Sequence, residues 1–492
     1  MAYPHRLLPL ALALVAAPLL PACSYDVGAQ AGDFGVTPGG AQDLRFARAR
    51  IEAGYIPDAE SYRVEGIFSE HDLPIASDSP CERLLCPRSA VARTTLLDGS
   101  ERLLVQLGFA TNTSPETFTR RPLNLAVAVD ISGSMTGEKL DSVKEALHTL
   151  VDQLGADDRL SLIAFDDEAE LRLPSTEMNL SGRSTLKKAI DKLATDGGTN
   201  IEAGLSLAYA QVDAHDGASG VEDRVLLLTD AQPNVGATNT SSFMGQARAR
   251  ADQGIGLTVL GVGLDLGAEL AQEIATVRGG NYFYLADAEA IAAVFDDEFE
   301  MMVTPLAYDL EVRIATAAGW RFAEAFGAPL DEPGTEVDFG ASTLFLSSRG
   351  GGMGLTLEPG EGGTLPASAE ALATFDLAYL PVGAQSPVDD ALTVPWQGGA
   401  PYQTDTVAAD DVGVFKMAVL IDEYMALQAG SAFCAGQQGA AAAIEAIERA
   451  ADNLDAAAAV LSDEGLADEA ALMRKLAENV GVGVERCDAG YY

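Results

Sequence analysis

A series of short apolar runs between residues 122 and 300 restricts the fold of this chain more than any other feature. The runs are continuous rather than alternating, at 125–129, 160–165, 225–228 and 257–262. Strands that are buried on both faces have this pattern. Two segments between the runs instead place apolar residues on one helical face: Leu140, Val143, Leu147, Leu150, Val151 and Leu154, and then Ile201, Leu205, Ala208, Tyr209 and Val212. The alternation predicts an α/β domain over 122–300, with a doubly wound, mostly parallel sheet.

The segments on either side of this domain alternate apolar and polar residues, as half-buried strands do. We predict one β segment at 61–118 and a second β region at 305–405, with Gly- and Pro-rich turns between its strands. The apolar positions are Tyr62, Val64, Phe68, Leu103, Val105, Leu107 and Phe109 in the first segment, and Leu306, Tyr308, Leu310, Val312 and Ile314 at the start of the second. Because such strands pair most simply as antiparallel neighbours, we expect both segments to form one flanking β-sandwich into which the α/β domain is inserted.

The two ends of the chain differ from these regions. Residues 411–487 carry apolar stripes with helical spacing, which predict a C-terminal helical hairpin followed by a third helical segment at 466–480. Residues 23–60 are rich in Gly, Ala, Asp and Pro and show weak periodicity. We therefore expect 23–60 to be a flexible tether.

The acidic composition excludes some classes of partner. The 31 Lys and Arg residues against 73 Asp and Glu residues give a formal net charge of −42. This field repels phosphate backbones and anionic lipid headgroups, so we expect no nucleic-acid binding. We also expect no nucleotide, because the glycine patterns at 254–256 and 261–263 lack the spacing of dinucleotide-binding loops.

The first 22 residues have the features of a secretory signal peptide: basic residues, an apolar region and a small residue before Cys23. The ending Leu20-Pro21-Ala22-Cys23 resembles the bacterial lipobox, which implies lipidation of Cys23 and an exported protein that contacts the membrane through its lipid anchor only. Ser24 rather than Asp follows the cysteine, which is compatible with the outer membrane of a Gram-negative bacterium. The alternative is a signal peptide that is cut at another small residue. No later segment offers the ~18 uninterrupted apolar residues of a transmembrane helix.

The other four cysteines form two clusters, and an exported protein favours their oxidation. We predict the disulfides Cys81–Cys86 and Cys434–Cys487. Zinc binding is the alternative, but the chain lacks a Cys-x-x-Cys pair and has few histidines.

Short oxygen side chains follow the buried strands of the α/β domain. Asp130, Ser132 and Ser134 follow the first strand, Thr199 precedes the helix at Ile201, and Asp230 ends the 225–228 strand. Turn and helix-capping roles would suit the first three residues alone. In open α/β sheets, however, the loops beyond the carboxyl ends of the strands meet and bind ligands. Carboxylates and hydroxyls suit Mg²⁺, with Ca²⁺ and Mn²⁺ as alternatives.

The five residues resemble the metal-ion-dependent adhesion site of von Willebrand factor A domains, an Asp-x-Ser-x-Ser motif joined by a Thr and an Asp from later loops. The resemblance covers about 122–300. It implies that Ser132, Ser134 and Thr199 are hydroxyl ligands and that Asp130 and Asp230 coordinate the metal directly or through water. The flanking regions are similar in order to those of bacterial surface proteins with this domain and, more distantly, of inter-α-trypsin inhibitor heavy chains.

The resemblance implies a binding module for adhesion or complex assembly, in which the metal accepts an Asp or Glu of a protein partner. One alternative is an envelope scaffold with a structural metal. The other is a metal-dependent hydrolase, because an open metal position can activate water. The chain has neither His-Glu-x-x-His nor a Gly-x-Ser-x-Gly elbow, and we expect that it is not an enzyme.

Overall fold

The structure is a computed structural model of the 492-residue chain. It describes residues 35–38 and 44–487, apart from gaps at 78–79, 98, 114–117, 216, 218–219, 231–234, 236–239, 263–272, 275, 286–294, 296–298, 331, 348, 350, 361–362 and 399–410. The predicted signal peptide and the predicted lipidation residue Cys23 lie outside these ranges. None of the described helices is both long enough and apolar enough to span a membrane.

The α/β domain contains a six-stranded sheet in the order β6-β5-β4-β7-β8-β9, in which only β6 is antiparallel to its neighbour. The strands are β4 (Leu123–Asp130), β5 (Arg159–Phe165), β6 (Ala169–Glu177), β7 (Glu222–Thr229), β8 (Gly256–Val262) and β9 (Gly280–Leu285). Every residue of β4 and of β8 is buried, as their continuous apolar runs predict. The structure thus has the predicted mostly parallel sheet.

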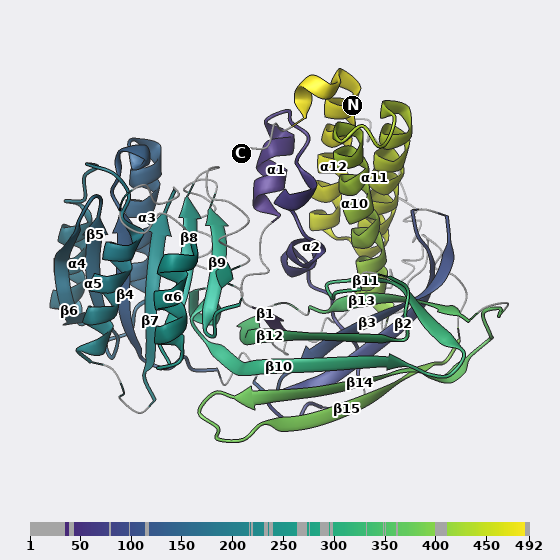
Figure 1. Ribbon diagram of the computed structural model, residues 1–492, viewed down its shortest axis with the longest axis horizontal. Helices are drawn as coiled ribbons and strands as arrows, with labels where there is room; N and C mark the ends of the chain where they lie inside the picture. Colours follow the sequence, from purple (N-terminus) through teal and green to yellow (C-terminus); the bar gives the residue numbers. More distant parts are fainter. Residues whose placement is uncertain are drawn as a thin grey trace, which may run out of the picture. The chain divides into compact units, whose positions relative to one another are not determined.

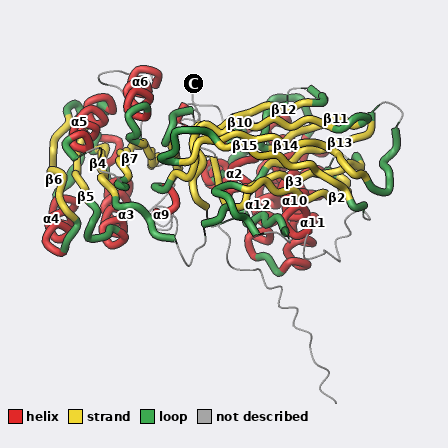
Figure 2. The backbone as a smooth tube through the Cα atoms, turned by 90° about the horizontal axis from the view of Figure 1, so that it is seen from below, coloured by secondary structure: helices red, strands yellow, loops and turns green. Residues whose placement is uncertain are grey.

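Helices cover both faces of this sheet, which explains why its strands are apolar throughout. They are α3 (Glu138–Gln153), α4 (Leu180–Ile190), α5 (Ile201–Asp213), α6 (Thr240–Ala251) and the short α9 (Phe299–Met302). Figure 1 and Figure 2 show α3 and α4 on one face and α5 and α6 on the other. Each face has its own apolar core, one with Leu140, Leu147 and Leu186 and the other with Leu205 and Tyr209.

Two antiparallel sheets flank this domain in sequence. One has the order β1-β12-β10-β14-β15 and the other β11-β13-β3-β2. The strands are β1 (Gly35–Pro38), β2 (Cys86–Thr95), β3 (Glu101–Ala110), β10 (Pro305–Thr316), β11 (Trp320–Phe326), β12 (Glu336–Ser347), β13 (Met353–Pro359), β14 (Ala369–Pro381) and β15 (Val388–Trp396). Side chains of both sheets share one apolar core. Strand β3, which precedes the α/β domain in sequence, pairs with β13, which follows it. This is the arrangement that the insertion hypothesis requires.

Three long helices follow: α10 (Val412–Cys434), α11 (Ala440–Leu461) and α12 (Glu464–Val482). Their apolar faces form a core with residues of two helices from the N-terminal part of the chain, α1 (Arg45–Glu52) and α2 (Val64–Glu70). Short 3-10 turns lie at Ala59–Ser61 and Val484–Arg486. The C-terminal helices agree with the prediction.

The N-terminal part of the chain requires two corrections. Within the expected tether 23–60, Gly35–Pro38 pairs with β12, and Arg45–Glu52 is helix α1, whose residues Ala47 and Ile51 are fully buried. Within the expected strand region 61–118, the residues around Val64 and Phe68 form helix α2 instead of a strand. The helical core explains both differences, because it buries these apolar residues at tertiary contacts that local periodicity does not reveal.

A cluster of charged groups links α1, α2, α10 and α12 within this helical core. The Arg48 guanidinium donates to Glu469 at 2.7 and 2.9 Å and to Glu70 at 2.7 Å, and the His71 ring lies 3.2 Å from Glu469. Burial alone would raise the pKa of Glu469, but hydrogen bonds from His71 and Arg48 lower it to about 2. Glu423 is fully buried, and its carboxyl group shares a hydrogen bond with the carboxyl group of Glu469. Burial first, and then the charge of Glu469, raise its pKa well above the usual range.

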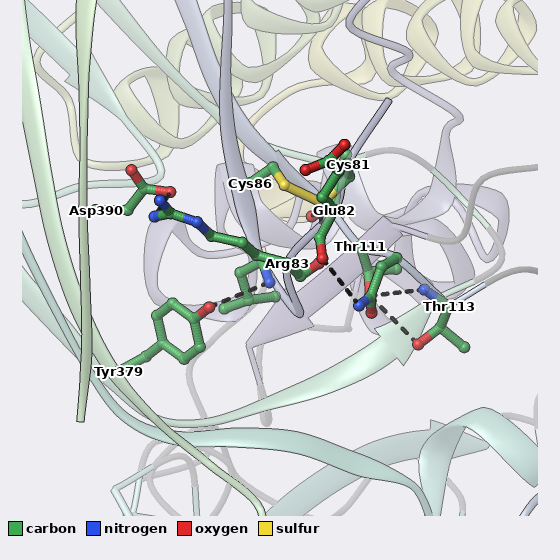
Figure 3. The surroundings of a disulfide bond; sticks show 11 residues. Cys81, Glu82, Arg83, Cys86, Thr111, Thr113, Tyr379 and Asp390 are labelled. Carbon is green, nitrogen blue, oxygen red and sulfur yellow. Dashed lines mark hydrogen bonds and ion pairs between the residues drawn. A yellow bond between two sulfur atoms is a disulfide. The ribbon is translucent and has the colours of Figure 1, made fainter. Parts of the chain in front are cut away.

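Both predicted disulfides, Cys81–Cys86 and Cys434–Cys487, are present. The first closes a short loop before β2, and Figure 3 shows this loop beside Tyr379 and Asp390. Arg83 forms a 2.8 Å ion pair with Asp390, and the Leu85 amide donates to the Tyr379 hydroxyl at 3.3 Å. The loop therefore fastens the start of β2 to strands of the other sheet. The second disulfide joins the end of α10 to the segment after α12.

Candidate metal centre

The candidate site lies where β4 and β7 end, at the carboxyl edge of the parallel sheet. The chain leaves β4 at Asp130, passes through a 3-10 turn at Gly133–Met135 and enters α3. Between the turn and the helix, Gly137 has φ +83°, a conformation that residues with a Cβ rarely adopt. The turn places Ser132 and Ser134 beyond the end of the strand.

Asp130 is held at the floor of the site. One of its carboxylate oxygens accepts a 2.8 Å hydrogen bond from the Ser132 amide, and the other accepts a 2.5 Å bond from the Thr229 hydroxyl. Its side chain is fully buried. Burial is the main cause that raises the pKa of Asp130 to about 6, and the nearby charge of Asp230 acts in the same direction.

Asp230 connects the end of β7 to the loop after β4. Its Oδ1 accepts a 2.8 Å hydrogen bond from the Ser134 hydroxyl, which lies 3.0 Å from the Ser132 hydroxyl. Its Oδ2 accepts a 2.6 Å bond from the ammonium group of Lys139 on α3. These contacts join four side chains from two loops and one helix.

Thr199 belongs to a third loop, between α4 and α5. The Gly133 amide donates to the Gly197 carbonyl at 3.1 Å, which brings this loop against the turn after β4. Gly197 has φ +60°, and a Cβ there would lie 2.9 Å from a carboxylate oxygen of Asp167, so the loop requires glycine. The structure therefore brings the loops of all five predicted residues to one edge of the sheet.

Four of the five predicted ligands are buried, and one is exposed to solvent. Asp130, Ser132, Thr199 and Asp230 are at most 1% exposed, whereas Ser134 is exposed. Lys139 pairs with only one of the two buried carboxylates, Asp230, in the contacts described above, and uncompensated negative charge is costly in a buried site. Two carboxylates and three hydroxyls are the oxygen donors that Mg²⁺ or Ca²⁺ prefers, so these residues fit a divalent cation.

Sequence reasoning missed two contributors to this edge. Asp167 accepts a 3.1 Å hydrogen bond from the Gly198 amide, and Lys139 pairs with Asp230. One indication of a special role for Lys139 was present in the sequence: it is a cation in the first turn of a helix, where the helix dipole favours anions.

A family model supplies the decisive comparison. The model of the von Willebrand factor type A domain matches residues 124–297, which include the sheet and the five residues above. Residues 124–297 form a von Willebrand factor type A domain. Domains of this family commonly bind a divalent metal at a metal-ion-dependent adhesion site.

Relatives of the vWA domain occur in bacteria and animals. The chain is 31% identical to Escherichia coli protein YfbK over 199 residues. This match covers 40% of this chain and 34% of that protein. It is 29% identical to human inter-alpha-trypsin inhibitor heavy chain H4 over 201 residues. This match covers 39% of this chain and 21% of that protein. The matches thus span about a fifth to a third of these relatives. A solved von Willebrand factor type A structure from Catenulispora acidiphila covers 82% of this chain and 97% of its own, at 17% identity and a TM-score of 0.47.

The zinc alternative from the sequence has no support in the described structure. The four clustered cysteines are paired in disulfides, and no group of three or more His, Cys, Asp or Glu side chains among the described residues is placed to hold a metal. His148 lies on the surface of α3 with its ring 2.9 Å from Asp191.

Proposed function

We propose that this protein binds a protein partner through a divalent metal ion in its vWA domain, for adhesion or for complex assembly. Asp130, Ser132, Ser134, Thr199 and Asp230 would hold the ion, and Mg²⁺ is the first choice, with Ca²⁺ or Mn²⁺ as alternatives. When bound, the ion supplies a positive centre that can accept a carboxylate oxygen of an Asp or Glu.

The observation that carries this proposal is the arrangement of the site around one exposed side chain. Asp130 and Asp230 lie fully buried, and the exposed Ser134 hydroxyl donates to Asp230 at the opening. An ion held here would be reached from outside across Ser134. A partner carboxylate would otherwise be repelled by a chain of net charge −42, so the metal provides the local positive charge that docking requires.

The site's hydrogen bonds favour a binding role over a purely structural metal. Asp130 and Asp230 each accept two hydrogen bonds from protein groups. Since protein groups also join these loops, we expect the domain to keep its fold when the ion is removed. The scaffold alternative predicts unfolding instead.

Affinity capture tests this function. Purified protein would be incubated with envelope extract in Mg²⁺ or in EDTA, with Asp130→Ala as the metal-site variant. The control is Asp157→Ala, an exposed residue in the turn before β5, at the end of the parallel strands opposite the site. We expect partners that are captured in Mg²⁺ by wild type and the control but lost in EDTA and in Asp130→Ala. Identical captured proteins under all conditions would reject the metal site as the interface.

We further propose that the chain is anchored to the cell envelope, in the outer membrane, by a lipid on Cys23. The support is the Leu-Pro-Ala-Cys ending of the apolar N-terminal region. Metabolic labelling with palmitate should mark wild type but not Cys23→Ala, and equal labelling would reject the anchor. We also propose that the protein has no catalytic activity of its own.

A further inference from the structure

We propose that Lys139 neutralises Asp230 and thereby keeps the metal-loaded site positively charged, so that it lowers metal affinity and raises affinity for a carboxylate. This inference rests on the proposed function and assigns a specificity-determining role to a residue outside the five predicted ligands. It predicts opposite effects of one substitution on two ligands, which a merely structural lysine would not produce.

The contacts of Asp230 are the first step. One carboxylate oxygen accepts from Lys139 Nζ at 2.6 Å and the other from Ser134 Oγ at 2.8 Å. The Asp230 side chain is fully buried, whereas that of Lys139 is 29% exposed. The lysine therefore reaches from the rim of the site to a buried carboxylate, and its charge lies between that carboxylate and solvent.

The position of Lys139 on its helix is the second step. Lys139 is in the first turn of α3, where the two acidic residues Glu138 and Asp141 agree with the helix dipole and the lysine does not. A lysine there does not stabilise the helix through its dipole. Its ion pair with Asp230 gives the position a different physical role.

Charge counting is the third step. Among the five predicted ligands and the lysine paired with them, Asp130 and Asp230 contribute one negative charge each and Lys139 one positive charge, so a divalent cation brings this group to a net charge of plus one. Without Lys139 the loaded site would be neutral. A neutral site attracts an incoming carboxylate less, while the same loss of a nearby positive charge makes the metal bind more tightly. Lys139 thus favours carboxylate capture over metal retention.

Calorimetric titration with Mg²⁺ alone tests the first half. Lys139→Met keeps the length of the side chain and removes its charge, and Lys144→Met removes the same charge elsewhere on α3. We expect about tenfold tighter Mg²⁺ binding in Lys139→Met, and wild-type affinity in Lys144→Met and in Lys139→Arg. Unchanged or weaker Mg²⁺ binding in Lys139→Met would overturn the inference.

Acetate titrated into protein saturated with Mn²⁺ tests the second half. Water-proton relaxation reports displacement of metal-bound water by acetate, and we expect several-fold weaker acetate binding in Lys139→Met than in wild type or Lys144→Met. Equal or stronger acetate binding would overturn the inference even if Mg²⁺ binds more tightly.

The proposed function can fail separately. If wild type binds no Mg²⁺, or if Asp130→Ala binds it equally well, the metal site itself is wrong and the role of Lys139 falls with it. If Asp130→Ala abolishes Mg²⁺ binding but Lys139→Met leaves both titrations unchanged, the metal site stands and only the inference about Lys139 is rejected.

Discussion

Replacing Glu423 by glutamine should stabilise the protein increasingly as the pH rises. The Glu423 carboxyl is fully buried, shares a hydrogen bond with Glu469, and interacts with the charges of Arg48 and Glu70. Burial raises its pKa, so the folded state keeps a proton that the unfolded chain releases above about pH 4.3. Stability from this group is therefore complete below that pH and declines as the pH rises towards the folded-state pKa.

The size of this effect follows from proton linkage. While Glu423 stays protonated in the folded state, each pH unit above about 4.3 lowers the free energy of unfolding by about 1.4 kcal/mol. This loss accumulates until the pH reaches the folded-state pKa, and Glu423→Gln removes it because the amide is neutral at every pH. Glu469, with a pKa of about 2, does not titrate in this interval.

Urea unfolding followed by far-UV circular dichroism at pH 5, 6 and 7 measures the difference. Relative to wild type, the free energy of unfolding of Glu423→Gln should rise with pH, by at most about 1.4 kcal/mol per pH unit. Glu469→Gln is the contrasting variant: it removes the negative charge that Arg48 and His71 both contact, and it should destabilise the protein at all three pH values. Parallel pH profiles for wild type and Glu423→Gln would refute the reasoning.

Three further predictions concern the framework and the site. Cys434→Ser should lower stability by about 4 kcal/mol, because the Cys434–Cys487 bond closes a loop with a sequence separation of 53, and thermal unfolding of the oxidised protein would reveal an unchanged midpoint if this is wrong. Gly204→Ala should cost about 1 to 3 kcal/mol in denaturant unfolding, because its Cβ would lie 2.6 Å from the buried Phe165 ring, and a stabilised variant would contradict the close packing of α5 on β5. Thr199→Ala should weaken partner capture in Mg²⁺ while the melting temperature stays close to that of wild type. Capture equal to wild type would remove Thr199 from the metal ligands.

The α/β domain could be predicted from sequence because its signals are local. Each buried strand is a continuous apolar run, and the rule that loops meet at the carboxyl edge of a parallel sheet was sufficient to group Asp130, Thr199 and Asp230. The disulfides were also predictable, since the four cysteines fall into two groups along the chain and each disulfide joins the two cysteines of one group.

The N-terminal helices were not predictable in the same way. Val64, Ile67 and Phe68 occupy one helical face and are buried, yet Tyr62 and Val64 also fit a strand's alternation. Helix α1 has only eight residues, too few to be stable alone, and it is held by tertiary contacts such as the pairing of Arg48 with Glu469. A contact between residues 421 positions apart leaves no local pattern.

The role of Lys139 was hidden for the same reason. Its partner Asp230 is 91 positions away, and only the folded sheet brings the two together. The types and spacing of the oxygen side chains predicted the metal ligands, but they gave no sign of the cation that pairs with Asp230.

Anomalous scattering from crystals grown with Mn²⁺ tests the central claim most directly. Diffraction data collected at the manganese edge locate the ion independently of any assumption about its ligands. We predict one strong anomalous peak in the vWA domain within about 2.0 to 2.6 Å of the Ser132 and Ser134 hydroxyl oxygens, absent from crystals of Asp130→Ala. A peak elsewhere in the wild-type protein, or none at Mn²⁺ concentrations that saturate binding in solution, would contradict the account.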